Sequence, residues 1–259
     1  MTQEVLRIAA ISDTHFGASE SRHRRNGILT YNEYRSNVKK MSQEADVIIH
    51  CGDFTDQGDK ESLKIAASIF SDATKPVLGV LGNHDIRQDF EMATEILSEE
   101  GGITLFDGNW MVDTYQDQRV GFIGMPGFQP RKDHHLDKEL QISQQAYNEM
   151  SGQQTTRFRQ EIRRVQGKNN IAFFHFDQIR SSSSEPETHP AEEIIVSEFA
   201  KLVDDYHYQV SLMLHGHDHR NIDRPATTPK KVRVENVAAR INIEMNPGVP
   251  YRLIDVPLR

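Results

Sequence analysis

The segment DVIIHCGDFTD, residues 46–56, is the part of the sequence that decides the fold class. Its first half is a short run of apolar and β-branched residues, which is typical of a buried strand. The glycine at position 52 then allows a sharp backbone turn, and Asp53 and Asp56 follow at once. In open α/β sheets, ligands bind beyond the carboxyl ends of the strands. The segment therefore predicts a strand that ends in a ligand-binding loop.

Similar apolar runs recur along the chain, and most are followed by a polar segment with helical periodicity. We expect strands over residues 5–11, 46–51, 76–81, 119–125, 170–174, 209–214, 232–237 and 251–256. We expect helices over residues 31–44, 60–71, 89–100 and 191–206. In residues 60–71, for example, the apolar side chains lie three and four positions apart and so share one face. Strands that alternate with helices indicate βαβ units and a layered α/β fold.

Two polar segments give weaker patterns. Residues 138–166 are predicted either as one helix with a break at Ser151-Gly152 or as a helix plus a lid-like excursion. Residues 181–190 form a Ser- and Pro-rich loop without periodicity. Because no repeat, long linker or change of composition divides the chain, we expect a single domain over residues 1–259.

The composition limits the partners that we expect. The 259 residues carry a formal net charge of −8, and no apolar run approaches the roughly 20 residues of a membrane span. The single cysteine, Cys51, excludes an internal disulfide, and the first residues lack the basic and apolar parts of a signal peptide. We therefore expect a soluble, cytoplasmic protein without a membrane partner. The acidity argues against nucleic acid but not against a small phosphate ester, because bound divalent ions reverse the local field.

Candidate ligands gather where five of the apolar runs end. In chain order they are Asp13, His15, Asp53, Asp56, Asn83, His84, His175, His217 and His219. We expect these strand ends to meet at one edge of one sheet. Carboxylate, amide oxygen and imidazole suit manganese, iron or zinc better than calcium. Two such ions about 3.5–4 Å apart can clamp an in-line displacement at phosphorus and make a water nucleophilic near neutral pH.

Each block alone has a simpler explanation, such as a turn, a surface histidine or a histidine packed in the core. All five occur in order, and each follows an apolar run. A metal site explains them together, whereas the simpler explanations must be invoked five times.

As a set, the blocks resemble the calcineurin-like metallophosphoesterase superfamily. Its pattern is Asp-x-His, Gly-Asp-x-x-Asp, Gly-Asn-His-Asp/Glu, a lone His and Gly-His-x-His, and residues 13–219 contain all five. The resemblance implies an α/β fold with a two-sheet mixed β-sandwich flanked by helices. It also implies a hydrolase of phosphate esters that uses two divalent metal ions.

The resemblance further implies a role for each residue of the pattern. The first metal ion would be held by Asp13, His15, Asp53 and His219. The second would share Asp53 and be completed by Asn83, His175 and His217. His84 would contact the phosphate and protonate the leaving oxygen as general acid, and Asp56 would hold its imidazole in place.

Residues 52–58 and 80–85 resemble the cyclic-nucleotide phosphodiesterase branch. Residues 120–128 and 235–238 are similar to bacterial phosphoesterases of unassigned substrate. Protein serine/threonine phosphatases carry Arg and Glu where this chain has Gln57 and Asp85, which argues against a phosphoprotein substrate. We expect small phosphodiesters of nucleotide type. A diester needs fewer basic side chains than a monoester, and only the basic cluster at residues 22–25 is expected to reach the site.

Three other functions remain open. The chain could be a phosphomonoesterase, or a nuclease of the same superfamily, although nucleases usually need a basic groove that this acidic chain lacks. It could also be a non-catalytic scaffold that binds metal. The retention of every ligand and of His84 favours an enzyme.

Overall fold

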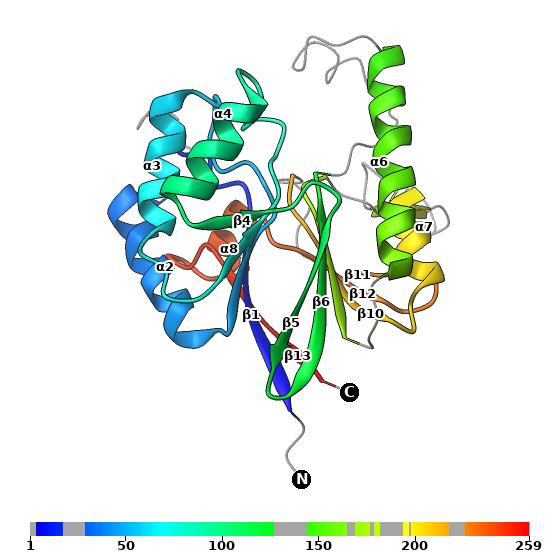
Figure 1. The fold of residues 1–259 in the computed structure, drawn as a ribbon. Coiled ribbons are helices and arrows are strands. Elements are labelled where there is room, and N and C mark those ends of the chain that lie inside the picture. Colours follow the sequence, from blue (N-terminus) through cyan, green and yellow to red (C-terminus); the bar gives the residue numbers. More distant parts are fainter. Residues whose placement is uncertain are drawn as a thin grey trace, which may run out of the picture.

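Two stacked β-sheets form the centre of the molecule, and helices cover the outer face of each (Figure 1). The computed structural model describes residues 4–17, 29–126, 144–164, 169–176, 179–181, 194–196, 198–217 and 226–258. All eight predicted strands are present in it, each within two residues of the expected bounds.

Both large sheets are mixed. The first contains, in spatial order, β13 (Arg252–Pro257), β1 (Val5–Ile11), β2 (Val47–His50), β3 (Val77–Gly79) and β4 (Ile103–Leu105). The second contains β11 (Ala226–Thr227), β12 (Arg233–Asn236), β10 (Val210–His215), β7 (Asn170–Phe174), β6 (Gln118–Met125) and β5 (Trp110–Tyr115). Their inner strands are parallel, whereas β13, β11 and β5 run antiparallel to their neighbours. This arrangement confirms the expected two-sheet α/β sandwich.

The side chains of β1 show how one strand serves two cores. Leu6, Ile8 and Ala10 are buried between the two sheets, against residues of β2, β7 and β10. Ala9 and Ile11 point the other way and pack under the helices. Successive side chains of a strand face opposite sides of the sheet, so an unbroken apolar run predicts a strand that is buried on both faces.

Helices α2 (Tyr31–Glu44), α3 (Lys60–Phe70) and α4 (Phe90–Glu95) cover the first sheet, and α4 continues as a π-helix over Ile96–Glu100. Helices α6 (Gln144–Arg164) and α7 (Glu198–Asp205) lie over the second sheet, and α8 (Ala239–Met245) precedes β13. The start of α2 is fixed by a capping box, in which the Thr30 hydroxyl accepts from Glu33 N and Thr30 N donates to the Glu33 carboxylate. Within the described residues, every helix is too short or too polar to span a lipid bilayer.

Two helix predictions need correction. The helix expected over residues 191–206 begins only at Glu198, and Ile194–Val196 instead forms β9, paired with β8 (Ile179–Ser181). Three β-branched residues in a row favour a strand once a partner strand is available. The break proposed at Ser151-Gly152 is absent, and α6 continues through it, because one glycine costs a helix only about 1 kcal/mol.

Candidate metal centre

The predicted ligands come from both sheets. Asp13, His15, Asp53 and Asn83 follow strands of the first sheet, whereas His175 and His217 follow strands of the second. The expectation of a single sheet edge is therefore wrong, because periodicity identifies strands but not the sheet that each strand joins. Hydrogen bonds between the loops connect the sheets at this point. His217 N donates to Asp13 Oδ2 at 2.9 Å, and His175 Nδ1 donates to the Cys51 carbonyl at 2.9 Å.

Asp53 lies at the middle of the cluster and is almost fully buried. Its Oδ2 is 3.4 Å from His175 Nε2, 3.8 Å from His15 Nε2 and 3.9 Å from His84 Nε2. Its Oδ1 accepts a hydrogen bond from the backbone N–H of His84 at 2.9 Å. Burial raises the pKa of Asp53, but His175 and the other imidazoles outweigh burial and hold the pKa well below its ordinary value. The carboxylate is therefore ionised and able to bind cations.

The potential ligand atoms form two groups that share one residue. His15, Asp53 and His84 make one group, and Asp53, His175 and His217 make the other. Within each group these atoms lie within 4.8 Å of one another. Carboxylate and imidazole are suitable ligands for two divalent ions, and Asp53 is placed to bridge them. Asp13 belongs to neither group, and both of its oxygens accept from His217 N.

His175 shows directly that this place favours a positive charge. Its Nδ1–H is donated to a carbonyl, so the neutral ring presents a lone pair at Nε2. That nitrogen faces Asn83 Oδ1 at 3.0 Å and Asp53 Oδ2 at 3.4 Å, which are also acceptors. Burial lowers the pKa of His175, but the Asp53 carboxylate raises it to about 9. At that pKa the ring also carries a proton on Nε2, directed at these two oxygens, and the same donor set fits a metal ion in place of that proton.

The backbone at the cluster is held in a costly conformation. Asp13, His15, Asp53 and His217 have φ of 58°, 46°, 54° and 65°, and they are four of the seven non-glycine residues with positive φ among those described. Each such residue costs on the order of 1–3 kcal/mol, and such strain is concentrated at functional sites. Four of the predicted ligands thus share a conformation that the surrounding fold must maintain.

Two glycines allow the loops to approach this closely. A Cβ at Gly82 would lie 2.1 Å from Asp53 Oδ1, and one at Gly216 would lie 1.9 Å from Ser12 Oγ and 2.6 Å from Asp13 Oδ2. No larger residue fits at either position without displacing a predicted ligand.

The sequence profile of the calcineurin-like phosphoesterase family matches residues 6–221. The chain belongs to this family. The two His/Asp groups that share Asp53 are consistent with the dinuclear metal site typical of its members. By family, the chain is a metal-dependent phosphoesterase.

Solved structures show the same fold at low sequence identity. The chain is similar to phosphopantetheinyl hydrolase from Mycobacterium tuberculosis, with a TM-score of 0.59, 15% identity and 95% of each chain covered. It is also similar to a protein from Staphylococcus aureus proposed to be a 5′-nucleotidase, solved with alpha-ketoglutarate, with a TM-score of 0.58 and 16% identity. That match covers 92% of this chain and 49% of the other, so the chain spans about half of that protein. No curated protein sequence matches the chain.

His84 lies at the rim of the phosphoesterase centre, beside His15, with ring centroids 4.6 Å apart. Its side chain is 20% exposed, so a substrate can reach it. Its Nδ1 donates to the main-chain carbonyl of Asp56 at 2.7 Å, whereas the Asp56 carboxylate lies 3.7 Å away. The expectation that Asp56 holds the imidazole needs correction in one respect: the hydrogen bond involves the carbonyl, and the carboxylate accepts from Gln57 Nε2 instead.

Three further residues contact the predicted site residues or the loops that carry them. The buried Asp85 carboxylate accepts from the N–H groups of Phe54, Thr55 and Gly82, and so connects the loops after β2 and β3. Burial and the nearby Asp53 raise the pKa of Asp85 to about 6. Asp85 is the last residue of the Gly-Asn-His-Asp block, directly after Asn83 and His84, and this position could have suggested its supporting role.

His50 is the second of these residues. Its ring stacks on Phe54 with centroids 3.6 Å apart, and burial lowers the pKa of His50 to about 3, so the ring is neutral. Nδ1 accepts from Gly52 N at 3.2 Å, which leaves Nε2–H facing Thr14 Oγ1 at 3.2 Å. His50 therefore supports the two loops that carry Asp13 and Asp53.

The third residue, Arg87, donates from Nη2 to His84 Nε2 at 3.0 Å.

Several predicted features lie outside the described residues. They are His219, the basic cluster at residues 22–25, residues 138–143 and residues 182–190.

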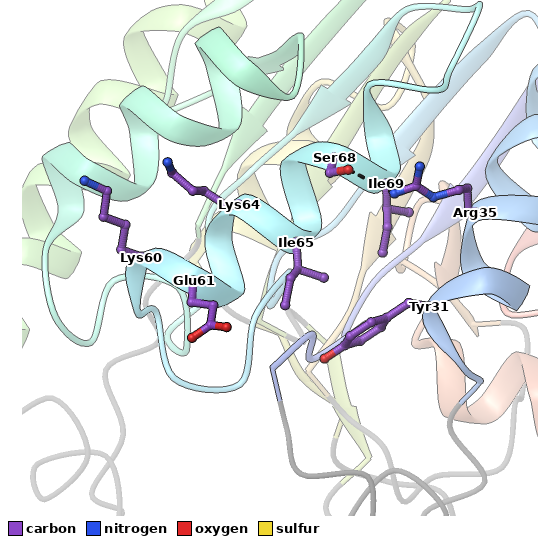
Figure 2. A pocket seen from close by; sticks show the side chains of 8 residues that line it. All are labelled: Tyr31, Arg35, Lys60, Glu61, Lys64, Ile65, Ser68 and Ile69. Carbon is purple, nitrogen blue, oxygen red and sulfur yellow. Dashed lines mark hydrogen bonds between the residues drawn. The ribbon is translucent and has the colours of Figure 1, made fainter.

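A groove of about 540 Å³ between α2 and α3 is lined by Tyr31, Arg35, Lys60, Glu61, Lys64, Ile65, Ser68 and Ile69 (Figure 2). None of these is a predicted ligand, so concave shape alone does not locate the metal centre.

Proposed function

We propose that this phosphoesterase hydrolyses small phosphate esters at a two-metal centre, with His84 as the general acid. One observation carries the proposal: Asp53 is common to two groups of ligand atoms that each fit within 4.8 Å. A shared carboxylate between two such groups is suited to a pair of ions.

We take the residues for each ion from the family pattern, because one of the two groups of ligand atoms includes His84, which we propose as the acid. The ion on the His15 side would be held by Asp13, His15, Asp53 and His219. The ion on the His175 side would be held by Asp53, Asn83, His175 and His217. Bound divalent ions would polarise the phosphoryl group and lower the pKa of a water. Manganese, iron and zinc all suit these ligands, and we expect manganese to restore activity best.

The protein's own groups complete the reaction site. The backbone N–H of His84 fixes Asp53 Oδ1, and the Cys51 carbonyl fixes the ring of His175 through Nδ1. His84 Nε2 faces Asp53 Oδ2 at 3.9 Å, so this nitrogen points toward the centre where the phosphate would bind. A proton delivered from His84 Nε2 would neutralise the alkoxide as it leaves.

For the substrate, we propose small phosphodiesters of nucleotide type, because the chain is acidic and a diester carries less negative charge than a monoester. A nucleic acid polymer is disfavoured for the same reason. The two structural neighbours are 16% and 15% identical, so their names assign no substrate here.

A phosphomonoesterase is the second candidate, and Arg87 favours it. Its guanidinium lies 3.0 Å from His84 Nε2, so a basic side chain does reach the site. A positive charge at this place favours the dianion of a monoester.

The test compares kcat/KM for an aryl diester and the matching aryl monoester, each corrected for its uncatalysed rate. The protein is reconstituted in turn with manganese, iron and zinc, and with each metal the free ion serves as the blank. We expect both esters to be hydrolysed, the diester faster. A monoester preference would support the second candidate. Turnover of both esters at the blank rate with every metal would contradict the proposed function.

A further inference from the structure

Arg87 lies in the turn before α4, and its guanidinium reaches back to the rim of the metal centre. Nη1 donates to the main-chain carbonyl of Asp56 at 2.9 Å, and Nη2 contacts His84 Nε2 at 3.0 Å. The same carbonyl accepts from His84 Nδ1 at 2.7 Å. One carbonyl oxygen and one guanidinium therefore hold both nitrogens of the His84 ring.

The donor and acceptor roles in this group have only one consistent assignment. A guanidinium only donates, so His84 Nε2 accepts from Arg87. The carbonyl of Asp56 only accepts, so in this arrangement the ring proton is on Nδ1. To act as the acid, Nε2 must take a second proton from solvent, which it can do only when Nη2 turns from it to the substrate. Nη2 thus lies one hydrogen-bond length from His84 Nε2, the nitrogen that faces Asp53. If His84 is the acid, the leaving oxygen of the substrate must come to this nitrogen.

The chemistry of the guanidinium suits an oxygen of a phosphate group. Its planar, permanently charged nitrogens match the spacing of phosphate oxygens, and the contact through Nη1 limits its movement. A bound phosphate oxygen offers Nη2 a charged acceptor in place of a neutral ring nitrogen. A hydrogen bond between two ionised groups also gains their mutual attraction, which the contact with a neutral ring nitrogen lacks.

We propose that Arg87 is a substrate-binding residue that donates to a non-bridging phosphate oxygen and positions His84 against the leaving oxygen. This inference rests on the proposed function, because it needs a phosphate at the metal centre. The inference also predicts that the contribution of Arg87 to binding depends on the charge of the substrate. The loss of Arg87 should weaken binding of a monoester dianion more than binding of a diester monoanion.

The experiment compares Arg87→Gln and Arg87→Lys with the wild type, all loaded with manganese. Arg35→Gln is the matched control, because Arg35 contacts Ser68 and Asp72 and, among the described residues, none of the predicted ligands (Figure 2 shows the Ser68 contact). The first readout is the Kd of inorganic phosphate by calorimetry, together with manganese content and the melting temperature. The second readout is kcat and KM separately, for aryl monoesters and diesters with good and poor leaving groups.

A charged hydrogen bond of typical strength predicts that Arg87→Gln weakens phosphate binding about 10- to 100-fold. KM for the monoester should rise by a similar factor, and kcat should fall most for poor leaving groups, since they depend most on His84. Arg87→Lys should recover part of the phosphate affinity, Arg35→Gln should match the wild type, and manganese content should be unchanged in all.

Two outcomes separate this inference from the proposed function. If the wild type turns over normally and Arg87→Gln binds phosphate as tightly as the wild type with full manganese, Arg87 is not a substrate-binding residue. If the wild type binds phosphate through Arg87 but hydrolyses no ester, the proposed function fails while the assignment of Arg87 stands. A manganese-loaded wild type that binds no phosphate contradicts both.

Discussion

Asp53 is the residue on which the centre depends most, because its two oxygens have different tasks. Oδ1 is fixed by the backbone N–H of His84, while Oδ2 faces the imidazoles of His15, His84 and His175. These partners follow three different strands, so one carboxylate connects loops that are far apart in the sequence. Its loss should therefore affect both metal positions, whereas the loss of one histidine should affect mainly one.

His84 gives the sharpest prediction at the residue scale. General acid catalysis typically contributes about 10²–10⁴-fold, so His84→Ala should lower kcat by about that factor while two metal ions stay bound. Substrates with activated leaving groups should lose less, since they need less protonation. Steady-state kinetics on a series of aryl esters, with metal analysis of each variant, makes the measurement.

Because His84 also lies in one of the two ligand groups, metal content decides its role. Loss of one ion in His84→Ala would show that His84 is a ligand. An equal loss of kcat across leaving groups would show that it is not the acid.

At the scale of elements, the sequence predicts where strands and helices lie better than how they assemble. The helix expected over residues 31–44 has the bounds of α2, and the structure shows that a local capping box and an apolar face define it. The single sheet edge was wrong, because the pairing of β7 and β10 in a second sheet depends on contacts far apart in sequence. The main-chain role of Asp56 and the reach of Arg87 could not be predicted, since neither follows from residue type or spacing.

Gly82 tests how closely the loops after β2 and β3 must pack. A methyl group there would lie 2.1 Å from Asp53 Oδ1 and 2.3 Å from Asp53 N. Gly82→Ala should therefore displace the shared carboxylate, and we expect both turnover and metal content to fall. Gly152→Ala is the matched control, because no described residue lies within 4 Å of the Cβ that alanine would add, and alanine should stabilise α6 by about 0.5–1 kcal/mol.

Calorimetric unfolding and metal analysis of both variants make the comparison. Normal metal content and turnover in Gly82→Ala would show that the loop can relax without cost to the centre. A loss of metal in Gly152→Ala would show that the effect is not specific to the close approach.

At the scale of the whole molecule, the two sheets serve as a frame that brings unlike ligands together. The first sheet delivers carboxylates, an amide and His15, and the second delivers His175 and His217. The apolar core between the sheets fixes their separation, because close-packed side chains leave little room for one sheet to slide on the other. An acidic chain can thus hold a centre that attracts phosphate once cations occupy it.

The central claim is that hydrolysis depends on two metal ions that share Asp53. The most direct measurement strips the protein with a chelator, titrates manganese back, and follows hydrolysis of an aryl phosphate ester against bound metal. The account predicts no turnover in the stripped protein, recovery that saturates at two ions per chain, and in Asp53→Ala weaker binding of both ions. Undiminished turnover after exhaustive chelation, or full recovery with one ion per chain, would contradict it.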